Sequence, residues 1–249
     1  MKNQPIVSVI TVTYNAEAFI ERTIKSVVAQ TYDNIEYVII DGKSKDGTLD
    51  IIKKYENQID TLVSEPDKGL YDAMNKSIDT ATGDYIVFMN AGDCFAADDT
   101  LELAMKGSNN ADLVYGLALR IDEETGAERA WHKKALPPEK LSYRSFIDGM
   151  VVCHQCFVVK RSCAEKYDLS TWKIANDIDW SIRTMKNVKT KHFYNETFCH
   201  FLEGGVSDER RWKAFRERFD ILRKHFGLLP TIWQQVLVAL KVIKRGRID

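Results

Sequence analysis

The sequence predicts an α/β domain built around a mostly parallel β-sheet, and three observations lead to this expectation. The chain has 249 residues, which is the length of one large domain with enough residues to bury a core. Its first hundred residues alternate short apolar, β-branched runs with segments of helical periodicity. The apolar runs lack a polar face, as expected for strands covered by helices on both sides. The composition, 45% hydrophobic and 29% charged, excludes a disordered, collagen-like or multi-span membrane protein.

Strands and helices are expected in strict alternation through the first ninety residues. Each expected strand is an apolar run rich in Val, Ile or aromatic residues, and each expected helix repeats apolar residues three and four positions apart. Turn residues such as Asp46 and Gly47 separate the segments. The expected strands are Ile6–Val12, Ile35–Ile40, Thr61–Ser64 and Asp84–Met89, and the expected helices are Glu17–Gln30, Thr48–Tyr55 and Gly69–Thr80.

The alternation becomes less regular after Asp99, and the expectations there rest on apolar runs and turn residues. One or two strands are expected first, then a hairpin that turns at Glu123–Gly126, and then a further strand, a helix and an extended segment. A Gly-Gly break precedes two closing amphipathic helices. In order, these segments are Ala111–Leu119, Arg120–His132, Val151–Val159, Ile174–Lys186, Lys189–Phe201, Gly204-Gly205, Glu209–Phe226 and Leu229–Ile243.

The five cysteines indicate a reducing compartment. Their number is odd and no secretory signal is recognisable, because Met1–Pro5 leads directly into the first expected strand. The spacing of Cys153 and Cys156 is compatible with a zinc or redox site, but no second Cys-X-X-Cys completes a zinc site. We therefore interpret these thiols as small buried side chains and expect a cytoplasmic protein.

The net charge of −1 is the sum of two unlike parts. Residues 210–249 contain 11 Lys and Arg against 3 Asp and Glu, a net charge of +8. The remaining residues contain 24 basic and 33 acidic side chains, a net charge of −9. The sequence thus has an acidic body and a basic tail, and such tails often contact anionic surfaces.

Polar residues follow each of the four N-terminal strands. Ligands of parallel α/β sheets bind beyond the carboxyl ends of the strands, so these residues are expected to form one site. The sequence has no GxGxxG after the first strand and no GxxxxGK[ST], so the Rossmann fingerprint and the P-loop are absent. A carboxylate-bearing site for phosphates implies a divalent cation, and Mg²⁺ or Mn²⁺ suits such oxygen ligands. The polar clusters are Thr11–Asn15, Asp41–Ser44, Glu65–Gly69 and Asn90–Asp93.

Four motifs in chain order resemble those of glycosyltransferase family 2, in the variants of the bacterial O-antigen and capsule transferases. The resemblance is dense over about the first 100 residues and thinner at Cys153–Gln155, Ala175–Arg183 and Gly204–Ser207. It implies a single nucleotide-diphospho-sugar transferase domain of the GT-A type and inverting transfer from a nucleotide sugar. The motifs are Ser8–Asn15, Val38–Thr48, Asp67–Asn75 and Thr82–Asp93.

The resemblance implies a metal-binding role for Asp93, which matches the last acidic position of the family's Asp-X-Asp motif. There it would hold Mn²⁺ or Mg²⁺ on the donor diphosphate and offset the charge that develops as the nucleotide leaves. The first acidic position is Asn90, an uncharged residue that can hydrogen-bond a ribose. His200, just before the Gly-Gly break, could approach the metal or the diphosphate. The alternative for Asp93 is a turn or capping residue.

The resemblance also implies a nucleotide subsite at the first two strands. Asp41 matches the carboxylate that accepts a hydrogen bond from the base, and Thr11 and Tyr14 match the loop that packs around the base. The family often has a second Asp where this chain has Gly42. The alternative for Asp41 is an Asx-turn.

Three further residues follow the third strand. Lys68 could lie near the diphosphate or in a solvated loop. Asp72 and Asn75 are one helical turn apart, so they can face the sugar together.

Asp177 matches the general base of the family, within Asn176-Asp177-Ile178-Asp179 at the start of an expected helix. Inverting transfer needs a carboxylate that accepts the proton of the acceptor hydroxyl. This chain has Asn176 where the family prefers Glu or Asp, and the alternative role of both residues is helix capping. His154 and Gln155 resemble a His-Gln pair of the acceptor half, where His154 either lines the sugar pocket or is a core histidine.

The closing helices have two interpretations. Their apolar stripes and basic flanks suit an interfacial helix on an anionic membrane, although the second segment is too short and too interrupted by polar residues to span a bilayer. Alternatively they pack on the body or on a second subunit in a homodimer. Nucleic acid is a poorer partner, because the acidic body would repel it. We therefore expect a nucleotide-sugar-binding half at residues 1–105, an acceptor and base half at 106–208, and a helical tail at 209–249.

The favoured hypothesis is a metal-dependent inverting glycosyltransferase that extends a lipid-linked oligosaccharide or polysaccharide at the cytoplasmic face of the membrane. The donor expected from the resemblance is a UDP-sugar. The alternative is a weakly active or inactive sugar-nucleotide-binding subunit, suggested by Gly42, Asn90 and Asn176. Nucleotidyl transfer is disfavoured, because Thr11–Asn15 contains no Gly and no basic residue.

Overall fold

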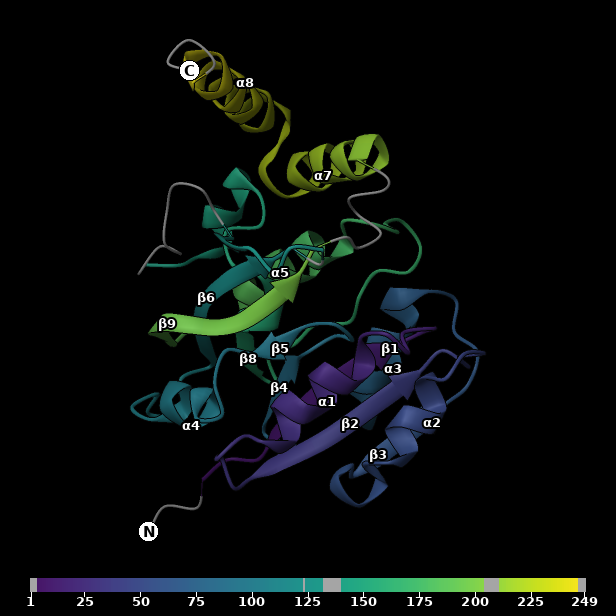
Figure 1. Cartoon of the computed structure of the whole chain (residues 1–249). Coiled ribbons are helices and arrows are strands. Elements are labelled where there is room, and N and C mark those ends of the chain that lie inside the picture. Colours follow the sequence, from purple (N-terminus) through teal and green to yellow (C-terminus); the bar gives the residue numbers. More distant parts are fainter. Residues whose placement is uncertain (1–3, 123, 132–139, 204–210, 246–249) are drawn as a thin grey trace.

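The structure is a computed structural model that describes residues 4–122, 124–131, 140–203 and 211–245. It confirms the predicted α/β class: within the described residues, a nine-stranded sheet is covered by helices (Figure 1). The N-terminal elements agree closely with the predicted ranges. They are β1 (Val7–Thr13), α1 (Ile20–Val28), β2 (Ile35–Asp41), α2 (Thr48–Lys53), a 3-10 turn η1 (Glu56–Gln58), β3 (Thr61–Ser64), α3 (Leu70–Thr80) and β4 (Tyr85–Phe88).

The four N-terminal strands are parallel and lie in the order β3-β2-β1-β4. Because the strand order reverses after β3, right-handed crossovers put α1 and α2 together on one face and α3 on the other (Figure 1). β1 and β4 are buried along their whole length, as expected for strands that are covered on both faces. This arrangement brings the carboxyl ends of all four strands to one edge of the sheet, which we call the rim.

The second half extends the same sheet with mixed strands. β8 is antiparallel to β4 and β6, β6 and β9 are parallel, and the β6–β7 hairpin lies where it was predicted. A short β5, which the sequence analysis did not predict, pairs with β9 beyond the rim. The elements are β5 (Cys94–Phe95), α4 (Thr100–Met105), β6 (Leu113–Ile121), β7 (Glu128–Ala130), η2 (Tyr143–Asp148), η3 (His154–Cys156), β8 (Phe157–Lys160), α5 (Asn176–Asn187) and β9 (Lys191–Leu202).

The segment predicted as a strand at Val151–Val159 is a strand only in its last part. A 3-10 turn, closed by the hydrogen bond from Cys156 N to Cys153 O at 2.9 Å, precedes β8. Cys153 and Cys156 are buried, as predicted, but they lie in this turn and not in a strand. A buried turn and a buried strand have the same apolar composition, which explains the wrong prediction. The turn is important for the site, because it carries His154 and Gln155.

Aromatic side chains connect the sheet to α3 and α5. Trp180 of α5 is fully buried, meets Phe88 of β4 edge to face at 5.8 Å and stacks on Tyr167 at 5.3 Å between ring centroids. Tyr167 also stacks on Tyr71 of α3 at 5.1 Å. Burying a large aromatic side chain stabilises a fold by about 1.5–3 kcal/mol, with about 0.5–1.5 kcal/mol more for each well-oriented ring pair. These contacts fix the start of α5 against the rim.

The C-terminal helices are α7 (Arg211–Phe226) and α8 (Leu228–Arg245). α7 packs on the body through Ala214, Ile221 and Leu222, all buried, which agrees with one of the two interpretations of the tail. Of the helices in the described part of the chain, none combines the length and the apolar character needed to cross a bilayer. The predicted Gly204-Gly205 break and the boundary at residue 208 lie outside the described residues.

Candidate active site

The nucleotide end of the rim is formed by the ends of β1 and β2. Asp41, the last residue of β2, is fully buried and pairs in register with Thr13 of β1. Its carboxylate accepts hydrogen bonds from Ser44 N at 3.0 Å, Ser44 Oγ at 2.5 Å and Ser64 Oγ at 2.6 Å. The turn contact that we gave as an alternative is thus present. A carboxylate can accept about four hydrogen bonds, so these contacts orient Asp41 and leave room for one more donor.

A second carboxylate lies beside this position. A Cβ added to Gly42 would collide with Asp67 Oδ2 and would lie 3.2 Å from the ring of Tyr14. Asp67, which follows β3, therefore occupies the space that a side chain at position 42 would fill. The ring of Tyr14 is 58% exposed, so it presents a free face at the same place. The family's second Asp is absent from residue 42, but a carboxylate from the next strand end takes its place.

Thr11 differs from its predicted position. Its side chain is fully buried, with Oγ1 donating to Met89 O at 2.8 Å and lying 3.1 Å from Tyr37 Oη. It therefore links β1 to its neighbours inside the sheet and has no free side at the rim. Thr13, two residues later, ends β1 with a buried hydroxyl that has no hydrogen-bond partner in the described structure.

The residues around the start of α3 have unequal roles. Lys68 is exposed and donates its backbone N–H to Asp72 Oδ2 at 2.9 Å, so Asp72 ties the loop before α3 to the first turn of that helix. The Asn75 amide does not face the rim together with Asp72. It donates to Tyr167 O at 3.0 Å and accepts from Tyr167 N at 2.7 Å, so both its polar atoms are occupied within the protein.

Asp93, the expected metal ligand, lies at the other end of the rim, which we call the metal end after that expectation, and it is 4% exposed. Its Oδ1 accepts the backbone N–H of Leu202 at 3.0 Å, and its Oδ2 accepts Gln155 Nε2 at 2.8 Å. Burial raises the pKa of Asp93 to about 8, against the opposing effect of these hydrogen bonds. Gln155 Oε1 in turn accepts the thiol of Cys153 at 2.6 Å, which fixes which end of the amide faces Asp93.

Asn90 and His154 meet next to Asp93. Asn90 Nδ2 lies 3.4 Å from His154 Nε2, while Asn90 Oδ1 is buried without a hydrogen-bond partner. His200 lies in β9, where its backbone pairs with Cys94 and Leu119. Its side chain is partly exposed, so the described contacts give it no fixed role at the metal end.

Asp93 and Asn90 fit a divalent cation that takes some of its ligands from the protein and the others from a substrate. No cluster of three or more His, Cys, Asp or Glu with metal-ligand geometry occurs among the described residues. Mg²⁺ and Mn²⁺ nevertheless often take only one or two protein oxygens, together with substrate phosphates. The orphaned Asn90 Oδ1 is such an oxygen, and a cation would favour the ionised form of Asp93 that burial disfavours.

Asp177 is the second residue of α5 and is partly exposed. Burial raises its pKa, and the charges of His154 and Arg218 oppose that rise. No side-chain hydrogen bond caps the start of α5, so the capping role that we gave as an alternative for Asp177 is not seen there. Asn176 is fully buried and donates to Asp168 O at 2.8 Å. Asp179 points into the protein toward α7.

The 3-10 turn η3 connects the two ends of this site. His154 contacts Asn90 and lies close enough to Asp177 to act on its ionisation, while the adjacent Gln155 binds Asp93. The sequence analysis noted this pair as similar to a His-Gln pair of the family, but not that its two side chains contact Asn90 and Asp93. Asp67 was included in a motif at the rim but was given no role of its own, and the C-terminal Glu217, described below, was missed because no local pattern singles it out.

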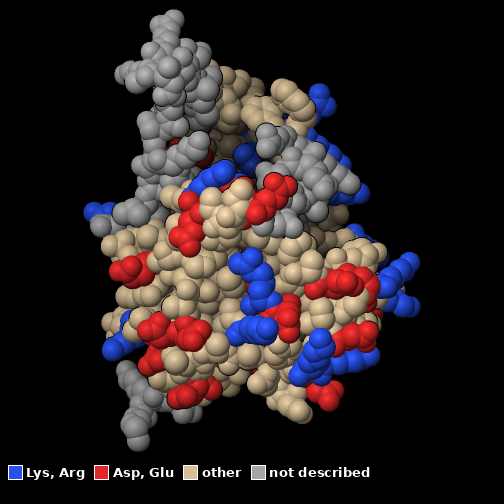
Figure 2. Space-filling view, viewed as in Figure 1, with Lys and Arg blue, Asp and Glu red and all other residues tan. Residues whose placement is uncertain are grey.

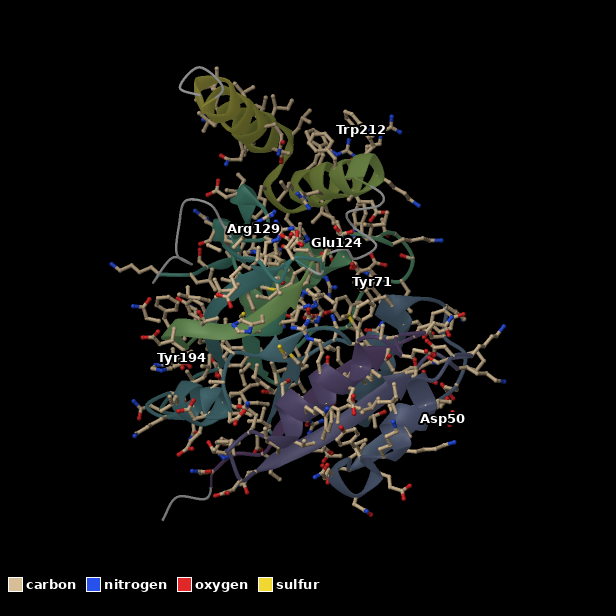
Figure 3. All side chains as sticks on the ribbon, viewed as in Figure 1. Asp50, Tyr71, Glu124, Arg129, Tyr194 and Trp212 are labelled. Atoms are coloured by element: carbon tan, nitrogen blue, oxygen red, sulfur yellow. The ribbon has the colours of Figure 1, made fainter. Side chains whose placement is uncertain are left out.

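Tyr71 marks where the two halves of the chain meet (Figure 3). It is in the first turn of α3 and donates its hydroxyl to Ile174 O, just before α5, at 2.7 Å. The mostly parallel sheet with helices on both faces matches the fold of solved glycosyltransferases of the GT-A type.

Comparison with known proteins identifies the family. The family model "Glycosyl transferase family 2" matches residues 8–168, more than half of the chain, so the protein belongs to this family. It is 27% identical to the putative teichuronic acid biosynthesis glycosyltransferase TuaG of Bacillus subtilis, over 97% of this chain and 98% of that protein. It is also 35% identical to an uncharacterised glycosyltransferase of Mycobacterium tuberculosis, over 91% of this chain and 88% of the other.

Solved structures share the fold at low sequence identity. TarS residues 1–349 from S. aureus superpose with a TM-score of 0.66 at 18% identity, covering 88% of this chain but only 65% of that fragment, slightly under two thirds. The same TarS fragment has been solved with UDP-GlcNAc. Mannosyltransferase PcManGT from Pyrobaculum calidifontis, in complex with GDP-Man and Mn²⁺, superposes with a TM-score of 0.63 at 18% identity, covering 100% of this chain and 77% of its own.

Proposed function

We propose that this glycosyltransferase moves a sugar from a nucleotide-diphosphate sugar, with a UDP-sugar as the expected donor, to a hydroxyl of a lipid-linked glycan, with inversion at the anomeric carbon. One observation carries the proposal. Asn90 and Asp93, where the diphosphate is expected, contact His154 and Gln155 of one 3-10 turn, and the charge of His154 lowers the pKa of Asp177, where a base is needed. A site of this kind can bind a leaving group at one end and receive a proton at the other.

The donor would lie along the rim. Asp41 and Asp67 offer acceptors to a base N–H, and the exposed ring of Tyr14 offers a stacking face. Lys68 lies just before α3 and its side chain is exposed, so it would be free to approach the diphosphate. Asp93 and Asn90 would hold Mn²⁺ or Mg²⁺, and His200 remains a candidate third ligand. The bound cation would offset the charge that develops on the departing diphosphate.

Asp177 would act as the general base. Its carboxylate accepts the proton of the acceptor hydroxyl while the hydroxyl oxygen bonds to the anomeric carbon. The bond from that carbon to the diphosphate oxygen breaks on the opposite face, and the nucleoside diphosphate leaves. A raised pKa makes Asp177 a stronger base, and its partial exposure keeps it within reach of an acceptor.

The test is turnover of a nucleotide-sugar panel with and without Mn²⁺, for the wild type and for Asp177→Asn. We expect Asp177→Asn to lower kcat by about 10²–10⁴ while donor binding persists. Asp220→Asn, a surface carboxylate on α7, is the matched control. Near-normal turnover of Asp177→Asn would show that this residue is not the base. A wild type that binds a donor but never turns it over would be the inactive subunit that we gave as the alternative.

The C-terminal helices support a membrane-bound acceptor. α8 turns Thr231 and Gln234 toward the body, and Gln234 bonds to Asp148, while its apolar residues face outward. A helix that covers a core in water has the opposite orientation, with its apolar face inward and its polar face outward. Trp212 of α7 extends the outward apolar surface, pointing away from the body (Figure 3), and Lys and Arg side chains gather around α7 (Figure 2). The exposed apolar residues are Trp212, Phe215, Leu228, Leu229, Ile232, Trp233, Val236 and Leu240.

An anionic bilayer offers both an apolar interior and negative headgroups, so it matches this surface better than water or a second acidic body does. The test is flotation with vesicles containing phosphatidylglycerol, using Leu229→Gln combined with Trp233→Gln. We expect the wild type to float and the variant to stay in solution, with Leu62→Gln on the opposite end of the sheet as control. If the wild type does not float and the variant instead dissociates a dimer, a homodimer covers this surface.

A further inference from the structure

Glu217 of α7 makes the densest polar contact between the C-terminal helices and the rest of the molecule. Its side chain is 9% exposed, and its Oε2 accepts three consecutive backbone N–H groups. The distances are 3.1 Å from Lys173, 2.7 Å from Ile174 and 3.1 Å from Ala175. These residues, which we call the 173–175 segment, directly precede α5 and therefore Asp177.

The 173–175 segment is held from two sides. Glu217 binds the N–H of Ile174, and the hydroxyl of Tyr71 donates to the carbonyl of the same residue at 2.7 Å. Both side chains are largely buried, so water does not replace these contacts easily. A carboxylate that accepts backbone N–H groups makes charge-assisted hydrogen bonds, which are roughly twice as strong as neutral ones. Asp177 lies three residues after Ile174, the residue that is held from both sides.

We propose that Glu217 is a positioning residue for Asp177, which makes α7 a part of the catalytic unit as well as a support for α8. The inference rests on the proposed role of Asp177 as the base. A base must lie within hydrogen-bonding reach of the acceptor hydroxyl, and a misplacement of about 1 Å can cost about 10²-fold in rate. Ala175, the N-cap residue of α5, supplies no side-chain hydrogen bond that would hold the start of the helix. Glu217 supplies that anchor from a different helix.

The alternative to a positioning role is that Glu217 only attaches α7 to the body. The chain offers a matched control for that role. His225, also on α7 and 5% exposed in its side chain, binds Asp179 Oδ1 at 2.8 Å and thus attaches the same helix to α5 without touching the 173–175 segment. Glu217→Gln and His225→Gln both weaken the attachment of α7 to the body. Only Glu217→Gln also weakens the hydrogen bonds to the 173–175 segment, which precedes the proposed base.

The experiment measures kcat and the donor KM for the full-length wild type, Glu217→Gln, Glu217→Ala, Tyr71→Phe and His225→Gln, together with Tm. We expect kcat of Glu217→Gln to fall at least about tenfold with the donor KM unchanged, and that of Glu217→Ala to fall further, because the amide oxygen of Gln still accepts hydrogen bonds. Tyr71→Phe should change kcat in the same direction. His225→Gln should keep its kcat at a comparable loss of Tm.

Hydrogen exchange provides a readout that does not depend on activity. Amides of the 173–175 segment should exchange about tenfold faster in Glu217→Gln than in the wild type, and should be unchanged in His225→Gln. The positioning role is overturned if Glu217→Gln and His225→Gln have the same kcat, or if the exchange of the segment does not change, while Asp177→Asn is inactive. If Asp177→Asn retains normal turnover, the proposed base fails and this inference fails with it.

Discussion

The nucleotide end of the rim and the start of α5 are built in different ways. Asp41 is oriented by Ser44, three residues later, and by Ser64 at the end of the neighbouring strand. The turn before Asp177 is held by Tyr71, 103 residues before Ile174, and by Glu217, 43 residues after it. The nucleotide end is thus determined mainly within one βαβαβ unit, whereas the position of the proposed base depends on packing between three distant parts of the chain. Changes at the nucleotide end should therefore affect binding, and changes near α5 should affect turnover.

Among changes at the rim, the largest effect on transfer is expected at Asp93, the proposed metal ligand. Asp93→Asn keeps an oxygen for the Leu202 N–H but removes the charge that a divalent cation needs. We expect transfer to fall by about 10²–10³, the usual loss when one group that stabilises transition-state charge is removed. Metal-stimulated turnover at saturating donor is the measurement, with exposed Asp79→Asn as control. Unchanged stimulation by Mn²⁺ in the variant would exclude Asp93 as the metal ligand.

A change confined to the nucleotide end should have a smaller effect, on affinity alone. A Cβ at Gly42 would push Asp67 away and press on the ring of Tyr14. We expect Gly42→Ala to weaken the binding of a nucleoside diphosphate about tenfold, a loss of about 1.4 kcal/mol, with kcat unchanged at saturation. Isothermal titration calorimetry measures this. Gly47→Ala, where the Cβ would meet the movable end of Glu17, is the control. A loss of kcat instead of affinity would contradict the division between the two regions.

His154 connects the two regions, and the pH profile shows on which side it acts. Its charge lowers the pKa of Asp177, against the larger effect of burial. Replacing it in His154→Gln removes that effect, so the pKa of Asp177 rises further. Because only the ionised carboxylate accepts the proton, the acidic limb of kcat against pH should move to higher pH. An acidic limb that stays in place would show that His154 does not act on the base.

The smallest effect on transfer is expected at Asp179, which attaches α5 to α7 away from the rim. Burial favours its neutral form, but hydrogen bonds from His225 and Arg183 hold its pKa well below the usual value of 3.8. A depressed pKa in the folded state stabilises the fold above the unfolded-state pKa, and this stabilisation is lost as the pH falls further. We expect the wild-type Tm to fall below about pH 4 more steeply than that of Asp179→Asn. Equal slopes for the two proteins would contradict this.

The sequence analysis succeeded where the determinants are local. The strands and helices of the first ninety residues have periodicities that their own sequence expresses, and the parallel sheet then brings Asp41 and Asn90 to one edge. It failed where local pattern and tertiary position differ. Thr11 lies on a strand next to the rim, yet its hydroxyl is used inside the sheet. Asn75 has the helical spacing for a shared face with Asp72, yet its amide binds the backbone of Tyr167.

Contacts between distant segments left no trace in any one segment. The apolar run around Cys153 and Cys156 has the composition of a strand, and only its partners make it a turn that aims His154 and Gln155 at the site. Glu217 is one acidic residue in a basic helix, where the sequence pattern gives it no role. Its three N–H donors are backbone groups, which carry no side-chain signal at all.

The two-sided attachment of Ile174 also has a consequence for the order in which the chain matures. As the chain leaves the ribosome, the sheet and the donor rim can assemble before α7 has been synthesised, because their contacts lie within the preceding residues. Glu217 arrives 43 residues after Ile174, so the base would be set only when almost the whole chain has emerged. A nascent chain would then bind sugar nucleotide early and acquire transferase activity last, which a ribosome-stalled chain lacking α7 would reveal.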